Sequence, residues 1–323
     1  MRPRVSVLMT AYNREAFIAD AIESVLAQTY SDFELIIVDD GSTDRTVEIA
    51  RHYAARDPRI SIHQNEKNLG QFPNRNHAAT LATGEFLKYH DSDDLMYPHS
   101  LQVTVPLLMA YPEAAFALSP GGRDWAGGPY PMLLTPRMAY QREFLGGGLF
   151  NVGPACALFR AEAFRRIGGF PCMGIPSDAI FLMNACMTEK ILLVPGGMLW
   201  YRCHPGQELV SAKAEREYLQ VLGDFWKVLH SPKCPLDAEE REQAKRNWTW
   251  LVGRDILRDF SGGHLRRARN RLACSTISAG QWLRYFRRQS NNVYAGTPRD
   301  ENGNFITPDW RVFGQNSASV KRD

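Results

Sequence analysis

The chain has 323 residues, 44% of them hydrophobic and 23% charged, which is typical of a globular protein with a core large enough for one large domain. Its net charge of +3 is too small to indicate a nucleic-acid partner, and its six cysteines include no C-x-x-C pair, which argues against a disulfide framework or a structural zinc site. No apolar run reaches the length of about 18 residues that spans a bilayer, and the N-terminus lacks the apolar segment of a signal peptide, so we expect a cytoplasmic protein.

The first hundred residues alternate between strand-like and helical periods. The predicted strands are 5–11, 33–38, 60–63 and 85–90, and the predicted helices are 15–28, 46–55 and 71–82. The strands are short apolar runs, whereas apolar residues in the first helix recur three and four positions apart. This order predicts an α/β fold with a mostly parallel, Rossmann-like sheet and helices on both faces.

Polar residues follow the first two predicted strands. The turn after the first strand consists of Thr10, Ala11, Tyr12 and Asn13. A dinucleotide fold needs a glycine-rich turn at this place, whereas an aromatic face with polar side chains suits a base or a ribose. Asp39 and Asp40 follow the second strand, and Asp39 could accept a hydrogen bond from a base N–H. The alternative for both aspartates is capping of the next helix.

Three carboxylates crowd into four residues at the end of the fourth predicted strand, at Asp91, Asp93 and Asp94. Like charges this close repel one another unless a cation or hydrogen-bond donors hold them, and open α/β sheets bind their ligands beyond the carboxyl ends of the strands. Oxygen ligands suit Mg²⁺ or Mn²⁺, which usually also hold substrate phosphates. The alternative is an acidic turn that caps the next helix.

The rest of the chain changes character twice. Between about 113 and 203, the predicted strands are 114–118, 155–159, 191–194 and 198–202, and the predicted helices are 161–167 and 177–187. Beyond 211 the sequence is helical, with predicted helices at 215–229 and 237–260. We therefore expect a catalytic domain over 1–207, made of halves 1–110 and 111–207, then a helical extension over 208–290 and a polar, partly disordered tail over 291–323.

Several ordered motifs resemble those of the family 2 glycosyltransferases. They lie at 5–13, 24–30, 38–44, 68–70, 74–76 and 91–94. The resemblance covers residues 4 to about 110 closely and extends to about 207 more loosely. It implies a GT-A fold, an inverting transfer and a nucleotide-diphosphate-sugar donor.

The resemblance also assigns roles in donor binding. It implies that the nucleoside is held by Thr10, Ala11, Tyr12, Asn13 and Asp39. It implies that the Asp-x-Asp element, here Asp91, Ser92 and Asp93, contacts ribose and the metal-bound diphosphate. Asp93 would be the direct ligand of Mn²⁺ or Mg²⁺, and Asp94 a second ligand or a brace. Arg75 would reach the donor sugar or diphosphate, and its alternative is a solvated helix charge.

The acceptor half departs from the family at one position. The family typically has Glu-Asp before an apolar helix, and here Ser177 precedes Asp178. By position Asp178 is the candidate catalytic base, and its alternative is a helix N-cap. Arg202 and His204 resemble an Arg-x-His motif of the family, in which Arg202 would bind the donor and His204 would ligate the metal or donate to the diphosphate. A structural histidine is the alternative.

The resemblance thus implies a metal-dependent inverting glycosyltransferase of the hexosyltransferase type. We expect it to move a sugar from a nucleotide-diphosphate sugar, with UDP favoured, to a hydroxyl of a glycan or lipid-linked acceptor in bacterial-type surface polysaccharide or glycoconjugate synthesis. Two other functions stay open. One is a catalytically inactive sugar-nucleotide or glycan-binding module, which the departure at Ser177 allows. The other is a sugar-phosphate nucleotidyltransferase, which usually has a glycine-rich basic loop that this chain lacks.

The segment 264–288 interleaves arginines with apolar residues, and no acidic residue occurs between Ser261 and Arg299. Such an element can lie on the anionic inner face of a membrane, as a peripheral contact. The alternative is a solvated helix face that packs on the catalytic domain through its aromatic residues. The helical extension is also the expected contact of a homo-oligomer.

Overall fold

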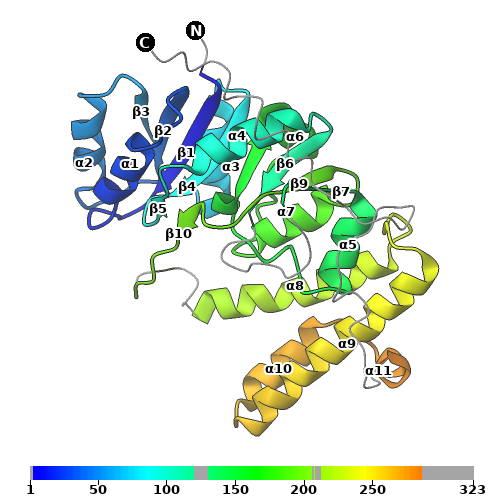
Figure 1. The fold of residues 1–323 in the computed structure, drawn as a ribbon. Coiled ribbons are helices and arrows are strands. Elements are labelled where there is room, and N and C mark those ends of the chain that lie inside the picture. Colours follow the sequence, from blue (N-terminus) through cyan, green and yellow to red (C-terminus); the bar gives the residue numbers. More distant parts are fainter. Residues whose placement is uncertain (1–2, 120–129, 206, 208–211, 286–323) are drawn as a thin grey trace.

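The computed structural model describes residues 3–119, 130–205, 207 and 212–285, and an eight-stranded sheet lies at its centre (Figure 1). The strand order is β3 (Ile60–Gln64), β2 (Phe33–Asp39), β1 (Val5–Ala11), β4 (Phe86–Asp91), β8 (Ala157–Arg160), β6 (Ala114–Leu118), β9 (Lys190–Leu193) and β7 (Met132–Leu134). β3, β2, β1 and β4 pair in parallel, β6 pairs in parallel with β9, and β8 and β7 run antiparallel to their neighbours. The mostly parallel sheet is confirmed. The tail 291–323 and the end of the arginine-rich segment lie outside the described residues.

Helices cover both faces of this sheet because its strands are apolar on both sides. Along β1, Val7 and Met9 face one hydrophobic cluster, whereas Leu8 faces the other, as expected when side chains alternate across a strand. The first face is covered by α1 (Ile18–Leu26), α2 (Thr46–Ala54) and α4 (Ser100–Ala110). The opposite face is covered by α3 (Gln71–Leu81), α5 (Pro136–Phe144), α6 (Ala161–Ile167) and α7 (Ser177–Ala185). The expected layers of an α/β fold are therefore present.

A short second sheet returns the chain to the end of β4. β5 (Leu95–Met96) pairs antiparallel with β10 (Leu199–Trp200), so that residues after 200 lie beside residues before 95. The strand predicted at 198–202 therefore stops at Trp200. Neither this pairing nor the strand β7 and the helix α5 was predicted.

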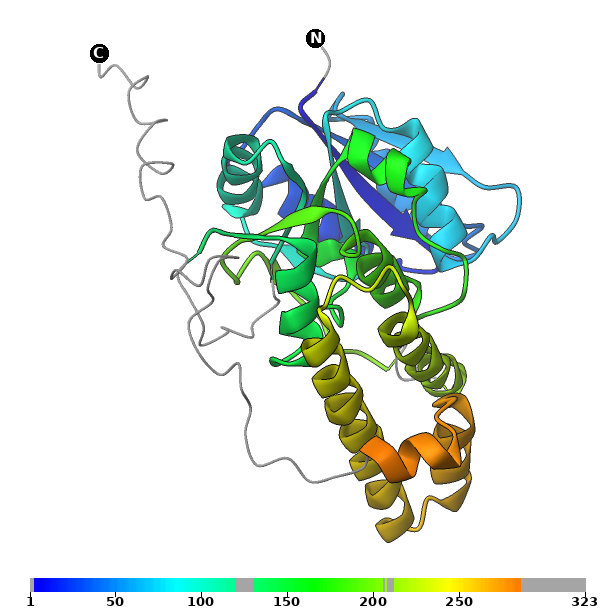
Figure 2. The same cartoon turned by 90° about the vertical axis from the view of Figure 1, so that its right-hand side faces the viewer.

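The helical extension consists of α8 (Ala212–His230), α9 (Ala238–Ser261), α10 (Leu265–Cys274) and α11 (Ala279–Tyr285) (Figure 2). α9 begins with a capping box, in which Asp237 and Glu240 satisfy each other's backbone N–H groups. Phe225 of α8 stacks on Trp248 of α9 with ring centroids 5.1 Å apart, and Phe144 of α5 contacts both rings. The extension thus shares a continuous core with the sheet domain.

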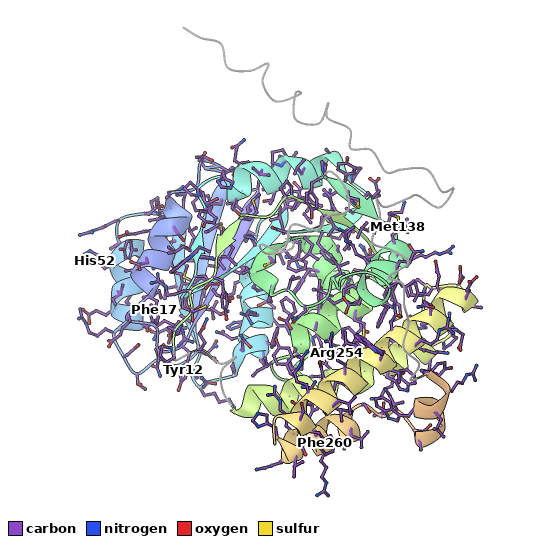
Figure 3. All side chains as sticks on the ribbon, turned by 60° about the horizontal axis from the view of Figure 1, so that its bottom comes forward. Tyr12, Phe17, His52, Met138, Arg254 and Phe260 are labelled. Carbon is purple, nitrogen blue, oxygen red and sulfur yellow. The ribbon has the colours of Figure 1, made fainter. Side chains whose placement is uncertain are left out.

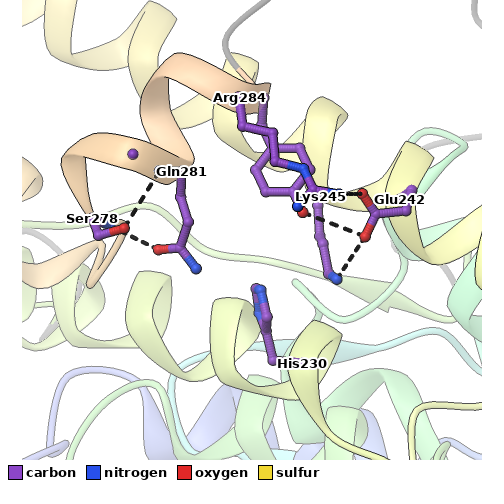
Figure 4. A pocket seen from close by; sticks show the side chains of 8 residues that line it. His230, Glu242, Lys245, Ser278, Gln281 and Arg284 are labelled. Carbon is purple, nitrogen blue, oxygen red and sulfur yellow. Dashed lines mark hydrogen bonds and ion pairs between the residues drawn. The ribbon is translucent and has the colours of Figure 1, made fainter.

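A polar network fastens α11 to α9. Glu242 accepts hydrogen bonds from Lys245 (2.9 Å), Arg284 (3.3 Å) and the Tyr285 hydroxyl (3.3 Å), as Figure 4 shows. These residues line a cavity of about 550 Å³ between α8, α9 and α11. Lys245 and Arg284 already donate to Glu242 in the lining of this cavity, so we assign the network to helix packing.

Among the described residues, no helix is both long enough and apolar enough to span a bilayer.

Candidate active site

The residues predicted to bind a nucleotide meet at the carboxyl edge of the sheet. The register of β1 places Ala11 opposite Asp39 of β2 and Thr10 opposite Asp91 of β4. The turn that follows β1 presents the Tyr12 ring, which is 46% exposed at this edge (Figure 3). An exposed aromatic face beside buried acids is suited to a flat, polar ligand.

Asp39 is buried and only half of its hydrogen-bonding capacity is used. Its Oδ2 accepts from the backbone N–H groups of Gly41 (3.2 Å) and Ser42 (3.0 Å). Its Oδ1 is also buried, and no described residue donates to it. An unpaired buried oxygen is costly, so this atom is a ready acceptor for an N–H of a bound ligand.

Asp40 has a different role from its neighbour. Its Oδ1 accepts from the Asn65 side chain and the Leu69 N–H, both at 2.8 Å, and its Oδ2 accepts from the Gly70 N–H at 2.9 Å. Its carboxylate therefore holds the loop 65–70 against the sheet edge. Neither aspartate caps α2 with its side chain, so the capping alternative is not what the structure shows.

Arg75 is 3% exposed and pairs with Asp91, so it is not a solvated helix charge. Burial disfavours the charged form of Asp91, but the Arg75 guanidinium outweighs this effect and holds the pKa of Asp91 below its ordinary value. The Nε and Nη1 of Arg75 are buried, and within the described chain they have no acceptor. Two N–H donors are thus available to oxygens of a ligand, such as those of a sugar or a phosphate.

Asp93 lies among three cationic or ionisable groups. Its Oδ2 accepts from Arg14 Nε at 3.0 Å and lies 3.1 Å from His204 Nε2. Arg202 donates from Nε to the Asp93 carbonyl at 2.8 Å. The His204 ring packs against Phe17, with centroids 4.4 Å apart. The structure therefore brings Arg202 and His204 to the Asp-x-Asp element. It adds Arg14, which the sequence analysis missed although it directly follows the turn after β1.

Ser92 and Asp94 support the same segment from inside. The Ser92 hydroxyl donates to the Thr10 carbonyl at 2.9 Å, which ties the segment to β1. Asp94 Oδ1 accepts the Arg202 N–H at 2.9 Å, and no described residue bonds its buried Oδ2. Burial, together with the charges of Asp91 and Asp93, raises the pKa of Asp94 to about 7. Asp94 thus braces the return of the chain from β10.

The described residues contain no group of three or more His, Cys, Asp or Glu side chains arranged to hold a metal ion. Asp93 and His204 nevertheless form a pair whose Oδ2 and Nε2 are 3.1 Å apart. Adjacent ligands of a six-coordinate cation, at about 2.1 Å from the ion, lie roughly 3 Å apart. The pair fits a site in which the protein supplies two ligands and a phosphate-bearing substrate supplies others, which is common for Mg²⁺.

Asp178 lies in the first turn of α7. α7 begins at Ser177 after Pro176, so Asp178 is not the N-cap, although its Oδ1 accepts the Ala179 N–H at 2.7 Å. Burial raises the pKa of Asp178 to about 6, against the opposing charge of Arg75. A carboxylate with this pKa is ionised at neutral pH and is a stronger base than an ordinary aspartate.

The turn before Asp178 is fixed from two directions. The buried Ser177 hydroxyl donates to the Gly174 carbonyl and accepts the Met173 N–H at 3.1 Å. From α8, Glu217 accepts the Ile175 N–H at 2.8 Å, and any side chain on Gly174 would collide with the Glu217 carboxylate. Sequence analysis missed Glu217 because its partner lies 42 positions away.

The adjacent Tyr218 lies within electrostatic reach of Asp178. Burial raises the pKa of this tyrosine to about 12, and the negative charge of Asp178 adds to the effect. The helical extension therefore borders the site beside Asp178.

Known proteins resemble the chain most over its first half. A profile of the family described as Glycosyl transferase family 2 matches residues 6–168. An uncharacterized glycosyltransferase of Haemophilus influenzae is 35% identical over 193 residues, which cover 58% of this chain and 73% of that protein. EpsE of Bacillus subtilis is 44% identical over 107 residues, which cover 33% of this chain and 38% of EpsE. The chain thus matches well under two thirds of the length of EpsE.

Two solved structures share the fold at low sequence identity. TarS of S. aureus in complex with UDP-GlcNAc superposes with a TM-score of 0.61 at 19% identity, covering 84% of this chain and 90% of that chain. A mannosyltransferase from Pyrobaculum calidifontis in complex with GDP-Man and Mn²⁺ has a TM-score of 0.59 at 21% identity, covering 87% of this chain and 78% of that chain. These likenesses confirm the predicted architecture.

The different roles of the neighbouring aspartates can be tested by amide hydrogen exchange. Asp40→Ala removes the acceptor of two backbone N–H groups, so we expect exchange at Leu69 and Gly70 to accelerate by about tenfold or more. The matched variant Asp39→Ala should leave those two amides slow and accelerate Gly41 and Ser42 instead. Equal effects of both variants on all four amides would contradict the division of roles.

Proposed function

The chain belongs to glycosyl transferase family 2, and from this premise we propose that it is a metal-dependent inverting glycosyltransferase that uses a nucleotide-diphosphate sugar. The observation that carries the proposal is the gathering of Asp39, Asp91 and Asp93 at one sheet edge, with buried donors and acceptors still unused. We propose a hydroxyl of a glycan or lipid-linked molecule as the acceptor, in surface polysaccharide or glycoconjugate synthesis. Among the described residues of the site, none favours a nucleotidyltransferase or an inactive binding module.

For the nucleoside we propose the turn after β1 together with Asp39. The Tyr12 ring offers a flat apolar face, and Asp39 Oδ1 offers an acceptor to a ring N–H. Uracil and guanine both carry such an N–H beside a carbonyl. We favour UDP, and the structural neighbours include one protein with UDP-GlcNAc and one with GDP-Man.

For the diphosphate and the metal we propose the Asp-x-Asp side of the site. Asp93 and His204 would hold Mn²⁺ or Mg²⁺, which supplies neutralisation of the charge that develops on the leaving diphosphate. Arg75 has two unused N–H donors for oxygens of the sugar or phosphate, and Arg202 keeps Asp93 in place through its backbone carbonyl. Positive charge from the metal ion and Arg75 would stabilise the charged leaving group more than the neutral sugar.

For the acceptor we propose Asp178 as the general base. In an inverting transfer the acceptor hydroxyl attacks the anomeric carbon opposite the departing diphosphate, and its proton passes to a carboxylate as the bond forms. With a pKa of about 6, Asp178 is ionised at pH 7 and can accept that proton. Ser177 does not disturb this role, because its hydroxyl closes the preceding turn.

The catalytic role of Asp178 predicts a loss of turnover without a loss of donor binding. In an assay of nucleotide release from UDP-sugars and GDP-mannose with a panel of acceptors and Mn²⁺, Asp178→Asn should slow turnover by about 10²–10⁴-fold and leave UDP affinity unchanged. The rate of the unmodified chain should fall below about pH 6, because protonation removes the base as the pH drops through the pKa of Asp178. Full activity in Asp178→Asn would exclude this base.

The metal assignment can be tested without turnover. Calorimetric titration with UDP should show tighter binding in Mn²⁺ than in chelator, and Asp93→Ala should weaken the affinity in Mn²⁺ by about tenfold or more. Asp224→Ala, which alters a carboxylate of α8 that pairs with Lys227, is the matched control and should bind as before. If Asp93→Ala retained the full Mn²⁺ effect, the metal would have other ligands.

Glu217 is predicted to position the turn that carries Asp178. Glu217→Leu removes the acceptor of the Ile175 N–H, so turnover should fall by about 10- to 100-fold while UDP affinity stays the same. Glu217→Gln keeps an oxygen acceptor and should retain most activity. A parallel loss in both variants, or a loss of UDP affinity, would contradict a positioning role.

A further inference from the structure

The outer faces of α9 and α10 expose an unusual number of large apolar side chains. They are Trp250, Leu251, Leu257, Phe260, Leu265 and Leu272, each between 38% and 61% exposed. We call the surface made of these side chains and of Arg266 and Arg269 the α9–α10 face. Large apolar patches on the surface of a protein mark interaction sites, whereas single exposed leucines do not.

These apolar residues are not the packing face of the bundle. α9 and α10 already pack against each other through Val252, Ile256 and Ala268, which are buried together with parts of Trp248 and Trp282. The exposed set lies on the remaining surface of the same two helices. The alternative that aromatic residues of this segment serve helix packing thus applies to Trp282 and Tyr285, not to the α9–α10 face.

The net charge of this surface is positive. Residues 250–272 contain six arginines and two aspartates, and no acidic residue follows up to Tyr285. Asp259 is buried and pairs with Arg271 at 3.0 Å, and Asp255 pairs with Arg254 at 3.2 Å. Arg258 also pairs with Asp255, at 3.7 Å, so the exposed charges left beside the apolar residues are those of Arg266 and Arg269.

We propose that the α9–α10 face docks on the surface of an anionic lipid membrane. Leucine, phenylalanine and tryptophan side chains enter the boundary between headgroups and acyl chains, while arginines meet the phosphates there. A second copy of the chain fits this face less well, because pairing two such faces would place arginines of one copy next to arginines of the other. The sequence indicated 264–288 for this contact, and the structure extends the surface to α9.

The position of the face suits a membrane-bound substrate. The extension projects from the side of the sheet at which β1, β2 and β4 end (Figure 1). Figure 3, which views the molecule from that side, shows Tyr12 and Phe17 near the candidate site and Arg254 and Phe260 on the extension. That the face would bring the site to a lipid-linked acceptor rests on the proposed function, whereas the docking itself does not.

Co-sedimentation of the 323-residue chain with vesicles, without donor or acceptor, tests the docking. We expect binding to vesicles of phosphatidylcholine mixed with phosphatidylglycerol, little binding to phosphatidylcholine alone, and weakening by salt. The double variants Leu257→Ser with Phe260→Ser, and Arg266→Glu with Arg269→Glu, should each reduce binding by about tenfold or more.

The matched control is Met109→Ser with Arg56→Glu, which changes an exposed apolar and an exposed basic residue on the sheet domain and should bind normally. Circular dichroism verifies that each variant is folded. Absence of binding to anionic vesicles at low salt would overturn the proposal. So would unchanged binding of both α9–α10 variants, or self-association that these variants abolish, which would identify a second copy as the partner. Loss of nucleotide release alone would bear on the proposed function and not on the docking.

Discussion

The ion pair between the buried Arg75 and the half-buried Asp91 is the constraint on which the sheet edge depends. Parallel strands bring five aspartates to this edge, and such a concentration of negative charge is unstable without compensation. The acids are compensated in several ways. Backbone N–H groups hold Asp39 and Asp40, Arg75 holds Asp91, Arg14 and His204 meet Asp93, and a raised pKa reduces the charge of Asp94. Among the described residues, Asp39 Oδ1 and two nitrogens of Arg75 have no partner, and a polar ligand would satisfy these atoms.

How much of this arrangement the sequence predicts depends on the range of the contacts. The strands β1 to β4 are consecutive neighbours or one crossover apart, so hydrophobic period and turn chemistry suffice to predict a mostly parallel sheet with Asp39 and Asp91 at the ends of its strands. β8 lies between β4 and β6 and runs antiparallel, and nothing in its four residues specifies that direction. The two-residue strands β5 and β10 are too short to show a period, although their pairing is what brings His204 to Asp93.

The extension is part of the catalytic unit in its packing, although the sequence changes character near 208. Phe225 and Trp248 belong to the same core as the residues of β8 and α7, and Arg137 of α5 pairs with Glu240 of α9 at 2.9 Å. The boundary near 208 marks a change of composition. The core that the sheet domain and the extension share forms only when both parts are folded. For this reason the side chains of α8 that border the site are held as rigidly as those of the sheet domain.

The serine at 177 is best understood together with Glu217. Ser177 is fully buried, and its hydroxyl bonds within the turn 173–177, which Glu217 also holds through Ile175. A glutamate at 177 would place a second carboxylate in this small volume, close to Glu217 and next to Asp178. With a neutral hydroxyl at 177, the ionisation of Asp178 is set by its burial, which raises its pKa, against the Ala179 N–H and the Arg75 charge, which lower it.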